Sequence, residues 1–326
     1  LPGTPEYDKA MAYVANKYKE FGLKPFGDKE GSTFYQTLTL RNSVVKNEQS
    51  FMISNDTDSL QVGKDYFYLG NANEVLTEFS GELVIAGYCI QAPEYGINDF
   101  ENLDVKGKIV VIFLGAPSSL PASERAYFSD LATKIVTLDN LGAEGFLFTI
   151  EPHISSRFNS IYNSMKNKGF ESVLLPSGKA LGITDYGTHL KFGGVINWST
   201  LSKLTGITAE EYKNYKENDS VMVQPSNTIH INGKVLSKFN EFESANVVGL
   251  LEGGELKDQY IVHTAHLDHI GIGRPVDGDS IYNGAHDNAS GISSMLEIAR
   301  LYSKLPSKPK RSVIFAAVTA EEMGLL

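Results

Sequence analysis

QYIVHTAHLDH (259–269), GAHDNASG (284–291) and SVIFAAVTAEE (312–322) are the three stretches that decide the fold of this chain. The first is apolar and β-branched as far as residue 266, which predicts a strand, and residues 312–318 predict a second, buried strand. Between them apolar residues recur at the spacing of one long helix: Ile292, Met295, Leu296, Ala299 and Tyr302. Strand, helix and strand in this order predict a right-handed parallel crossover, with chemistry at the carboxyl ends of both strands.

The N-terminal residues predict one helix and two strands. Thr4 and Pro5 are typical of a helix N-cap and of the first helical position, and apolar residues recur at helical spacing as far as Gly22. Residues 33–40 and 44–53 are rich in β-branched and aromatic side chains and predict strands. These elements can join the same core as the C-terminal crossover.

The middle of the chain has a different pattern of apolar and turn-forming residues. From residue 61 onward short apolar strands alternate with Gly, Pro, Asn and Asp turns, with one helical stretch near residues 127–141, and the polar segment SKFNEFES (237–244) predicts a linker back to the core. We therefore expect an α/β fold class. Residues 1–60 and 237–326 would form a core with a mostly parallel or mixed sheet and flanking helices, and residues 61–236 an inserted α+β domain.

Composition excludes several classes of function. The 326 residues carry 29 Lys+Arg against 39 Asp+Glu, a net charge of −10, and no basic cluster, so nucleic acid is not an expected partner. The single cysteine, Cys89, can form neither an intrachain disulfide nor a cysteine metal site. No run of 18 apolar residues predicts a membrane span. Any metal ion must therefore be bound by histidine and carboxylate.

Histidines cluster where the first strand ends. Four of the seven lie within 24 residues, together with two aspartates: His263, His266, His269, His286, Asp268 and Asp287. His266 and Asp268 follow the strand, where alternation places both side chains on one side, so that the carboxylate can orient the imidazole. A histidine held in this way is a good zinc ligand.

Three acidic residues lie at the start of the predicted helix or directly after the second predicted strand. Asp287 opens the helix in GAHDNASG, and Glu321 and Glu322 directly follow the strand 312–318, without Lys or Arg beside them. Unpaired acids that converge with histidine favour a divalent cation. The two adjacent glutamates can have different roles, since one can bind the metal while its neighbour takes a proton from water.

Each of these features alone also has a purely structural interpretation. An isolated His-x-Asp commonly only satisfies hydrogen bonds, Asp287 can be a carboxylate at a helix N-terminus, and the two glutamates can be solvated acids. The agreement of three blocks in order, spacing and position favours the metal site. His263 lies within the strand and is expected to pack, and His269 and His286 stay unassigned.

At these residues the chain resembles the co-catalytic zinc exopeptidases of metallopeptidase family twenty-eight. The resemblance implies that His266 binds one zinc, Asp287 bridges two, Glu322 binds the second, Glu321 is the general base and Asp268 orients His266. It implies a zinc-dependent exopeptidase, an aminopeptidase first, that hydrolyses peptide substrates with a water between the two ions. It also implies export to the periplasm or the outside of the cell.

Two stretches of the middle region resemble a protease-associated domain inserted into such a peptidase. They are DVKGKIVVIFLGAP (104–117) and NLGAEGFLFT (140–149). The resemblance implies that residues 61–236 shape access to the cleft or mediate contacts, without chemistry of their own. Residues 1–60 and 237–326 are then expected to be the two parts of the peptidase domain.

The sequence departs from the family at one point. The family completes its site with a further acid and a further histidine downstream of the glutamate doublet, whereas this sequence stops at Leu326. We expect a partial site with three of five ligands and poor or absent activity for such a chain. Two alternatives stay open: a receptor or adaptor relative without catalysis, and a single-zinc acyltransferase or cyclase on the same core.

Overall fold

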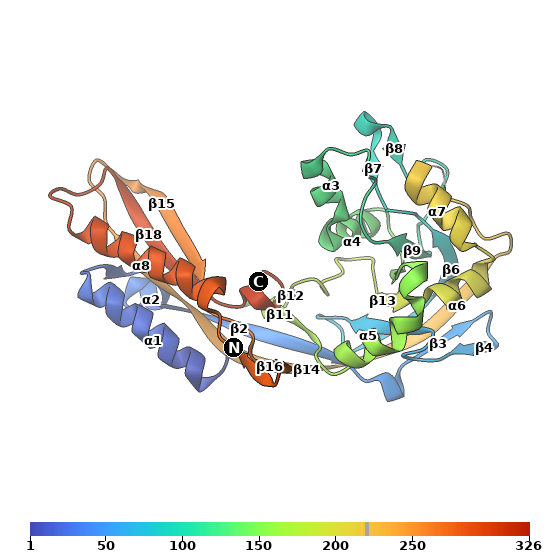
Figure 1. Ribbon diagram of the computed structural model, residues 1–326, viewed down its shortest axis with the longest axis horizontal. Coiled ribbons are helices and arrows are strands. Elements are labelled where there is room, and N and C mark those ends of the chain that lie inside the picture. The colour runs from blue at the N-terminus through green and yellow to red at the C-terminus, as the bar shows by residue number, and fades with distance from the viewer. Residues whose placement is uncertain (219–221) are drawn as a thin grey trace. The chain divides into compact units, whose positions relative to one another are not determined.

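The computed structural model describes residues 1–218 and 222–326, which divide into two compact units (Figure 1). Unit 1 comprises residues 1–41, 173–178 and 241–326, and unit 2 comprises residues 42–172 and 179–240. Three of the described strands contribute residues to both units: β2 (Tyr35–Val45), β11 (Phe170–Leu174) and β14 (His230–Leu251). All predicted site residues lie in unit 1.

Unit 1 is built on a mixed sheet in which β18 (Arg311–Val318) lies between β14 and β15 (Leu256–His266). β14 pairs with β18 in antiparallel register, with Gly249 opposite Phe315, and β15 pairs with β18 in parallel register. The short strand β1 (Lys24–Pro25) pairs with the other side of β14. This sheet and its helices confirm the predicted α/β class and the parallel pair of the crossover.

Two helices pack on one face of this sheet, α1 (Pro5–Glu20) and α8 (Ser290–Ser303) (Figure 1). The Thr4 hydroxyl caps α1 by accepting from the Tyr7 amide, which confirms the predicted helix start. Both helices bury their apolar stripes against β18, where Phe315 has no exposed surface. The remaining elements of unit 1 are α2 (Asp28–Gly31), β16 (Gly271–Val276), β17 (Asp279–Tyr282), η4 (Ala285–Ala289) and η5 (Glu321–Met323).

Unit 2 contains four parallel strands in the order β6-β9-β10-β13, with β5 antiparallel beside β13. Every residue of β9 is buried, as expected for a strand covered on both faces. The bounds of these strands are Tyr66–Gly70 (β5), Leu76–Ile85 (β6), Ile109–Phe113 (β9), Gly145–Thr149 (β10) and Phe192–Ile196 (β13).

Two hydrophobic clusters cover the two faces of this sheet. One includes residues of α6 and α7, among them Trp198, and the other includes residues of α4 and α5. The helices are α3 (Ala122–Ser129), α4 (Leu131–Asn140), α5 (Phe158–Met165), α6 (Trp198–Thr205) and α7 (Ala209–Asn218). The other strands are β3 (Phe51–Ser54), β4 (Asp58–Leu60), β7 (Gln91–Ala92), β8 (Ile97–Asn98), β11 (Phe170–Leu174) and β12 (Ala180–Leu181). No helix among the described residues is both long and apolar enough to cross a membrane.

Several predicted local elements are wrong. The expected linker 237–244 lies inside β14, a strand of 22 residues, because pairing of the main chain sustains a strand through polar residues. The predicted helix at 127–141 is two helices, since Asp130 ends α3 and caps α4 by accepting from the Thr133 amide. The predicted strand 44–53 is interrupted by a 3-10 turn at 47–49.

The boundaries of the compact units along the chain also differ from those of the predicted domains. Unit 2 begins at residue 42 and ends at residue 240, where the sequence placed the boundaries after residues 60 and 236. The strand β3 explains the first difference, because it pairs with residues 231–234 of β14 in unit 2. The interpretation of unit 2 as a protease-associated domain stays a prediction.

Candidate metal centre

The site is formed by the loops that follow two parallel neighbours, β15 and β18. His266 ends β15 opposite Val318 of β18, and the Leu267 amide donates to the Val318 carbonyl at 2.8 Å. The carboxyl ends of parallel strands meet at one edge of a sheet. The residues 266–269 and 319–322 are therefore neighbours in space, although more than 50 residues separate them in sequence.

His266 is the centre of the cluster, with 9% of its surface exposed. Its Nδ1 lies 3.1 Å from the main-chain carbonyl oxygen of Asp268, an acceptor to which Nδ1 can only donate. Its Nε2 lies 2.9 Å from Oδ1 of Asp287 and 3.7 Å from Oε2 of Glu321. The ring is thus oriented by the main chain, and Nε2 faces the acids.

Burial lowers the pKa of His266, but the Asp268 carbonyl and the carboxylates of Glu321, Asp268 and Asp287 outweigh burial. The pKa of the imidazole consequently lies above its ordinary value of 6.5. Each ion pair of this cluster joins a carboxylate to a histidine. The acids therefore create a negative field at Nε2, which attracts a cation.

Asp268 is almost fully buried, with 1% of its surface exposed, and its carboxylate holds the glutamate doublet. Its two oxygens accept from the amides of Glu321 at 3.2 Å and Glu322 at 3.1 Å. The sequence interpretation gave this carboxylate the task of orienting His266. In the structure the nearest carboxylate oxygen is 3.9 Å from Nδ1, and the main-chain oxygen of the same residue makes the hydrogen bond.

The glutamate doublet turns toward His266 at η5. Ala320 precedes it with a φ of +66°, in the left-handed region, so the chain reverses directly after β18. One ligand atom each of His266, Glu321 and Glu322 lies within 4.8 Å of the other two. Imidazole nitrogen and carboxylate oxygen at this spacing match the ligands that zinc prefers.

Asp287 reaches His266 from the irregular turn η4. Its φ of −117° and ψ of 90° are not helical, and this departure directs its carboxylate to Nε2 of His266. The sequence predicted that Asp287 opens the helix, whereas α8 begins at Ser290 after the N-cap Ala289. The Asn288 side chain accepts from the Gly291 amide in the first turn at 2.9 Å. The Asp287 side chain is 68% exposed.

The other three histidines of the cluster each lie in a different environment. His263 stacks on Phe315 in the core, with ring centroids 5.3 Å apart, as the packing interpretation expected. His286 is exposed beside Asp287. His269, which the sequence left unassigned, places Nδ1 2.6 Å from Oε1 of Glu322. The sequence linked it to the site only as a member of the histidine cluster, one residue after Asp268.

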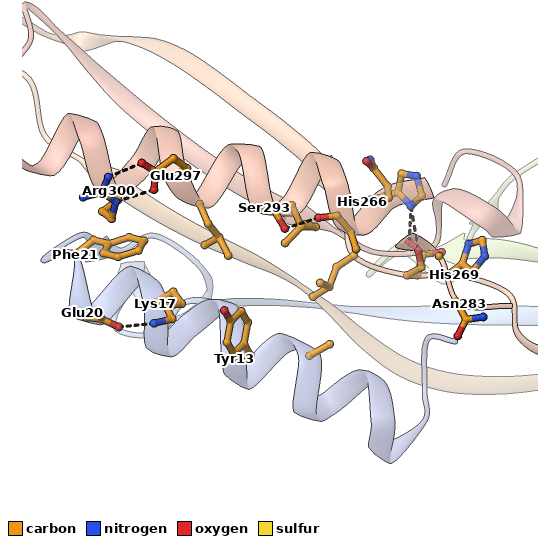
Figure 2. A pocket seen from close by; sticks show the side chains of 18 residues that line it. Tyr13, Lys17, Glu20, Phe21, His266, His269, Asn283, Ser293, Glu297 and Arg300 are labelled. Carbon is orange, nitrogen blue, oxygen red and sulfur yellow. Dashed lines mark hydrogen bonds and ion pairs between the residues drawn. The ribbon is translucent and has the colours of Figure 1, made fainter. Parts of the chain in front are cut away.

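An open pocket of about 550 Å³ adjoins His266 and runs between α1 and α8. Figure 2 shows His266, His269 and Asn283 at one end of this pocket and Glu297 and Arg300 toward the other. The site therefore has room for a ligand beside the imidazole.

Comparisons with known proteins find sequences similar to the C-terminal part of the chain. Residues 246–326 match the model of Peptidase family M28. Aminopeptidase NAALADL1 of Rattus norvegicus is 36% identical over 98 residues, which are 28% of this chain and 12% of that protein. A probable zinc metalloprotease of Pyrenophora teres f. teres is 39% identical over 80 residues, which are 24% of this chain and 17% of that protein. The matches thus span less than two thirds of either relative.

Among solved structures, an aminopeptidase from Aneurinibacillus sp. strain AM-1 aligns with a TM-score of 0.43 and 17% sequence identity. The alignment covers 99% of this chain and 60% of that chain.

Proposed function

We propose that residues 246–326, which match the model of Peptidase family M28, form part of the zinc site of a peptidase, an aminopeptidase first. One observation carries the proposal. His266, Glu321 and Glu322 bring a nitrogen and two carboxylate oxygens within 4.8 Å of one another, and Asp287 lies 2.9 Å from the same nitrogen. Relatives named aminopeptidase and zinc metalloprotease support it.

In this proposal Nε2 of His266 and the carboxylates of Asp287 and Glu322 hold zinc, with two ions in the complete site. The residues fit zinc because Nδ1 of His266 donates to a carbonyl, which leaves Nε2 for the ion. A bound zinc ion polarises the carbonyl of the peptide bond and makes a nearby water more acidic.

Glu321 is the general base of the proposed reaction. Its carboxylate is 36% exposed, so that water can reach it, and Asp268 fixes its main chain. Glu321 takes one proton from a water molecule while the water oxygen bonds to the carbonyl carbon of the substrate. The carbon–nitrogen bond then breaks, and Glu321 returns the proton to the departing amine, which gives a carboxylic acid and an amine.

The charges of the site favour a substrate with a free α-amino group. Acidic groups near the proposed metal site can also accept from an ammonium group. A carboxypeptidase would instead need a cation that binds the substrate carboxylate. Arg300 lines the pocket, but its guanidinium donates to Glu297 at 2.7 Å and is already neutralised.

The test is metal content together with hydrolysis in the natural protein that carries this sequence. We expect elemental analysis to find zinc, and leucine anilide hydrolysis to stop with a chelator and return with added zinc. The variant His266→Ala should lose both, whereas the exposed His153, which is 72% accessible, serves as the control His153→Ala. Hydrolysis that continues without metal would contradict the proposal, and activity only on N-terminally blocked peptides would exclude an aminopeptidase.

A further inference from the structure

His269 makes a short contact with one of the proposed zinc ligands. Its Nδ1 lies 2.6 Å from Oε1 of Glu322, and both side chains are largely buried, with exposed fractions of 22% and 19%. A histidine nitrogen beside a carboxylate donates to it, and the bond is charge-assisted. One of the two Glu322 oxygens is therefore fixed from outside the metal cluster.

The ring of His269 also packs against the loop that carries Asp287. Gly284 adopts a φ of +64°, and a Cβ at this position would stand 2.9 Å from both Cγ and Cδ2 of His269. The Gly284 carbonyl accepts from the Ala289 amide at 3.0 Å and so closes the turn around Asp287. One imidazole thus touches two segments that each carry a proposed ligand.

We propose that His269 is a positioning residue that sets the orientation of the Glu322 carboxylate relative to the Asp287 loop. The proposal rests on the proposed zinc function. A carboxylate with one oxygen held by His269 presents the other oxygen in a fixed direction, whereas a free glutamate must lose rotamer entropy when it binds an ion.

Direct ligation by His269 is the main alternative to positioning. The group of ligand atoms within 4.8 Å of one another contains His266, Glu321 and Glu322, and His269 is outside it. Its Nδ1 is already engaged by Glu322, at a distance typical of a hydrogen bond. The geometry thus points to an action through Glu322.

The experiment compares three substitutions of His269. His269→Leu and His269→Phe remove the donor, and Phe keeps a ring, whereas His269→Asn keeps a donor as many bonds from Cα as the Nδ1 that contacts Glu322. The control is His153→Leu, at a side chain that is 72% exposed in unit 2. Zinc affinity is measured by competition with a chromogenic chelator, and the visible spectrum is recorded with cobalt in place of zinc.

We expect His269→Leu and His269→Phe to bind zinc about 10- to 100-fold more weakly, the usual effect of losing a partner of a metal ligand. His269→Asn should stay within a few-fold of the wild type, and all variants should keep the cobalt absorption bands, because no ligand is lost. Circular dichroism confirms the fold, and the Phe variant remains a test if the Leu variant does not fold.

Three results would overturn the proposal. Equal zinc affinity of the wild type and of His269→Leu and His269→Phe would overturn it while leaving the zinc site intact. Cobalt bands that shift in every His269 variant would replace it with direct ligation. A wild-type protein that binds no zinc would overturn the proposed function as well, so the two failures can be told apart.

Discussion

Lys134 offers a test of the buried electrostatics of unit 2. It lies on α4 with 1% of its surface exposed, and its ammonium donates to the Tyr88 carbonyl and lies 5.9 Å from the Tyr88 ring centroid. No carboxylate of the described residues comes within ion-pair distance of it. Burial lowers the pKa of Lys134 from its ordinary value of 10.5 to about 8, although Cys89, Asp99 and Asp130 partly oppose this.

The sign of the effect follows from proton uptake. Between pH 8 and pH 10.5 the amine is neutral in the folded chain and charged in the unfolded chain, so unfolding takes up a proton and stability rises with pH. Each pH unit in this window is worth about 1.4 kcal/mol. From pH 7.5 to pH 9.5 the Lys134 contribution to the free energy of unfolding should therefore increase by about 2 kcal/mol.

The Cys89 contribution to the free energy of unfolding decreases with pH, in the opposite direction to that of Lys134, because burial raises the pKa of the Cys89 thiol to about 12. The measured quantity is therefore the difference between the wild type and Lys134→Met, in which the Cys89 contribution largely cancels. Denaturant unfolding is followed by the fluorescence of Trp198, the single tryptophan, which is buried in unit 2. The control is Lys213→Met, at a side chain 68% exposed. A difference that stays constant from pH 7.5 to pH 9.5 would refute the reasoning.

Two further predictions concern the metal centre. Glu321→Gln should lower leucine anilide hydrolysis by about 10²- to 10⁴-fold, the usual worth of a general base, while elemental analysis finds unchanged zinc. Activity within tenfold of the wild type would reject Glu321 as the base. Asp268→Asn should lower the free energy of unfolding of unit 1 by about 2 kcal/mol in calorimetry. Asparagine replaces one carboxylate oxygen by an NH₂ group, which cannot accept from the main-chain amides of Glu321 and Glu322 as the two Asp268 oxygens do. A variant of unchanged stability would show that these two hydrogen bonds contribute little.

The elements with strong periodicity could be predicted from the sequence. The helix that Thr4 caps, the strand that ends at His266 and the helix from residue 290 form as expected. β14 could not be predicted, because residues 237–244 are mostly polar and only partner strands far away in sequence make them extended. Local composition is a weak guide where main-chain pairing decides the structure.

The candidate site could be predicted as a set of residues but not as a set of contacts. The structure brings His266, Asp287, Glu321 and Glu322 together around buried Asp268. The sequence could not show that a main-chain carbonyl orients His266, since every residue has one. Nor could it assign His269, whose role depends on a turn that places Glu322 beside it.

The ion pair between Arg41 and Glu241, at 2.8 Å, joins residues 200 apart in sequence, both in unit 1. Apart from residues 173–178, the chain between Arg41 and Glu241 belongs to unit 2, so the two large segments of unit 1 enclose a very long loop. Closing such a loop as an open coil costs several kcal/mol of entropy, whereas a loop that has already condensed presents its ends together. Folding of unit 2 should consequently bring these segments of unit 1 together, and slow folding of unit 2 should delay assembly of the proposed zinc ligands.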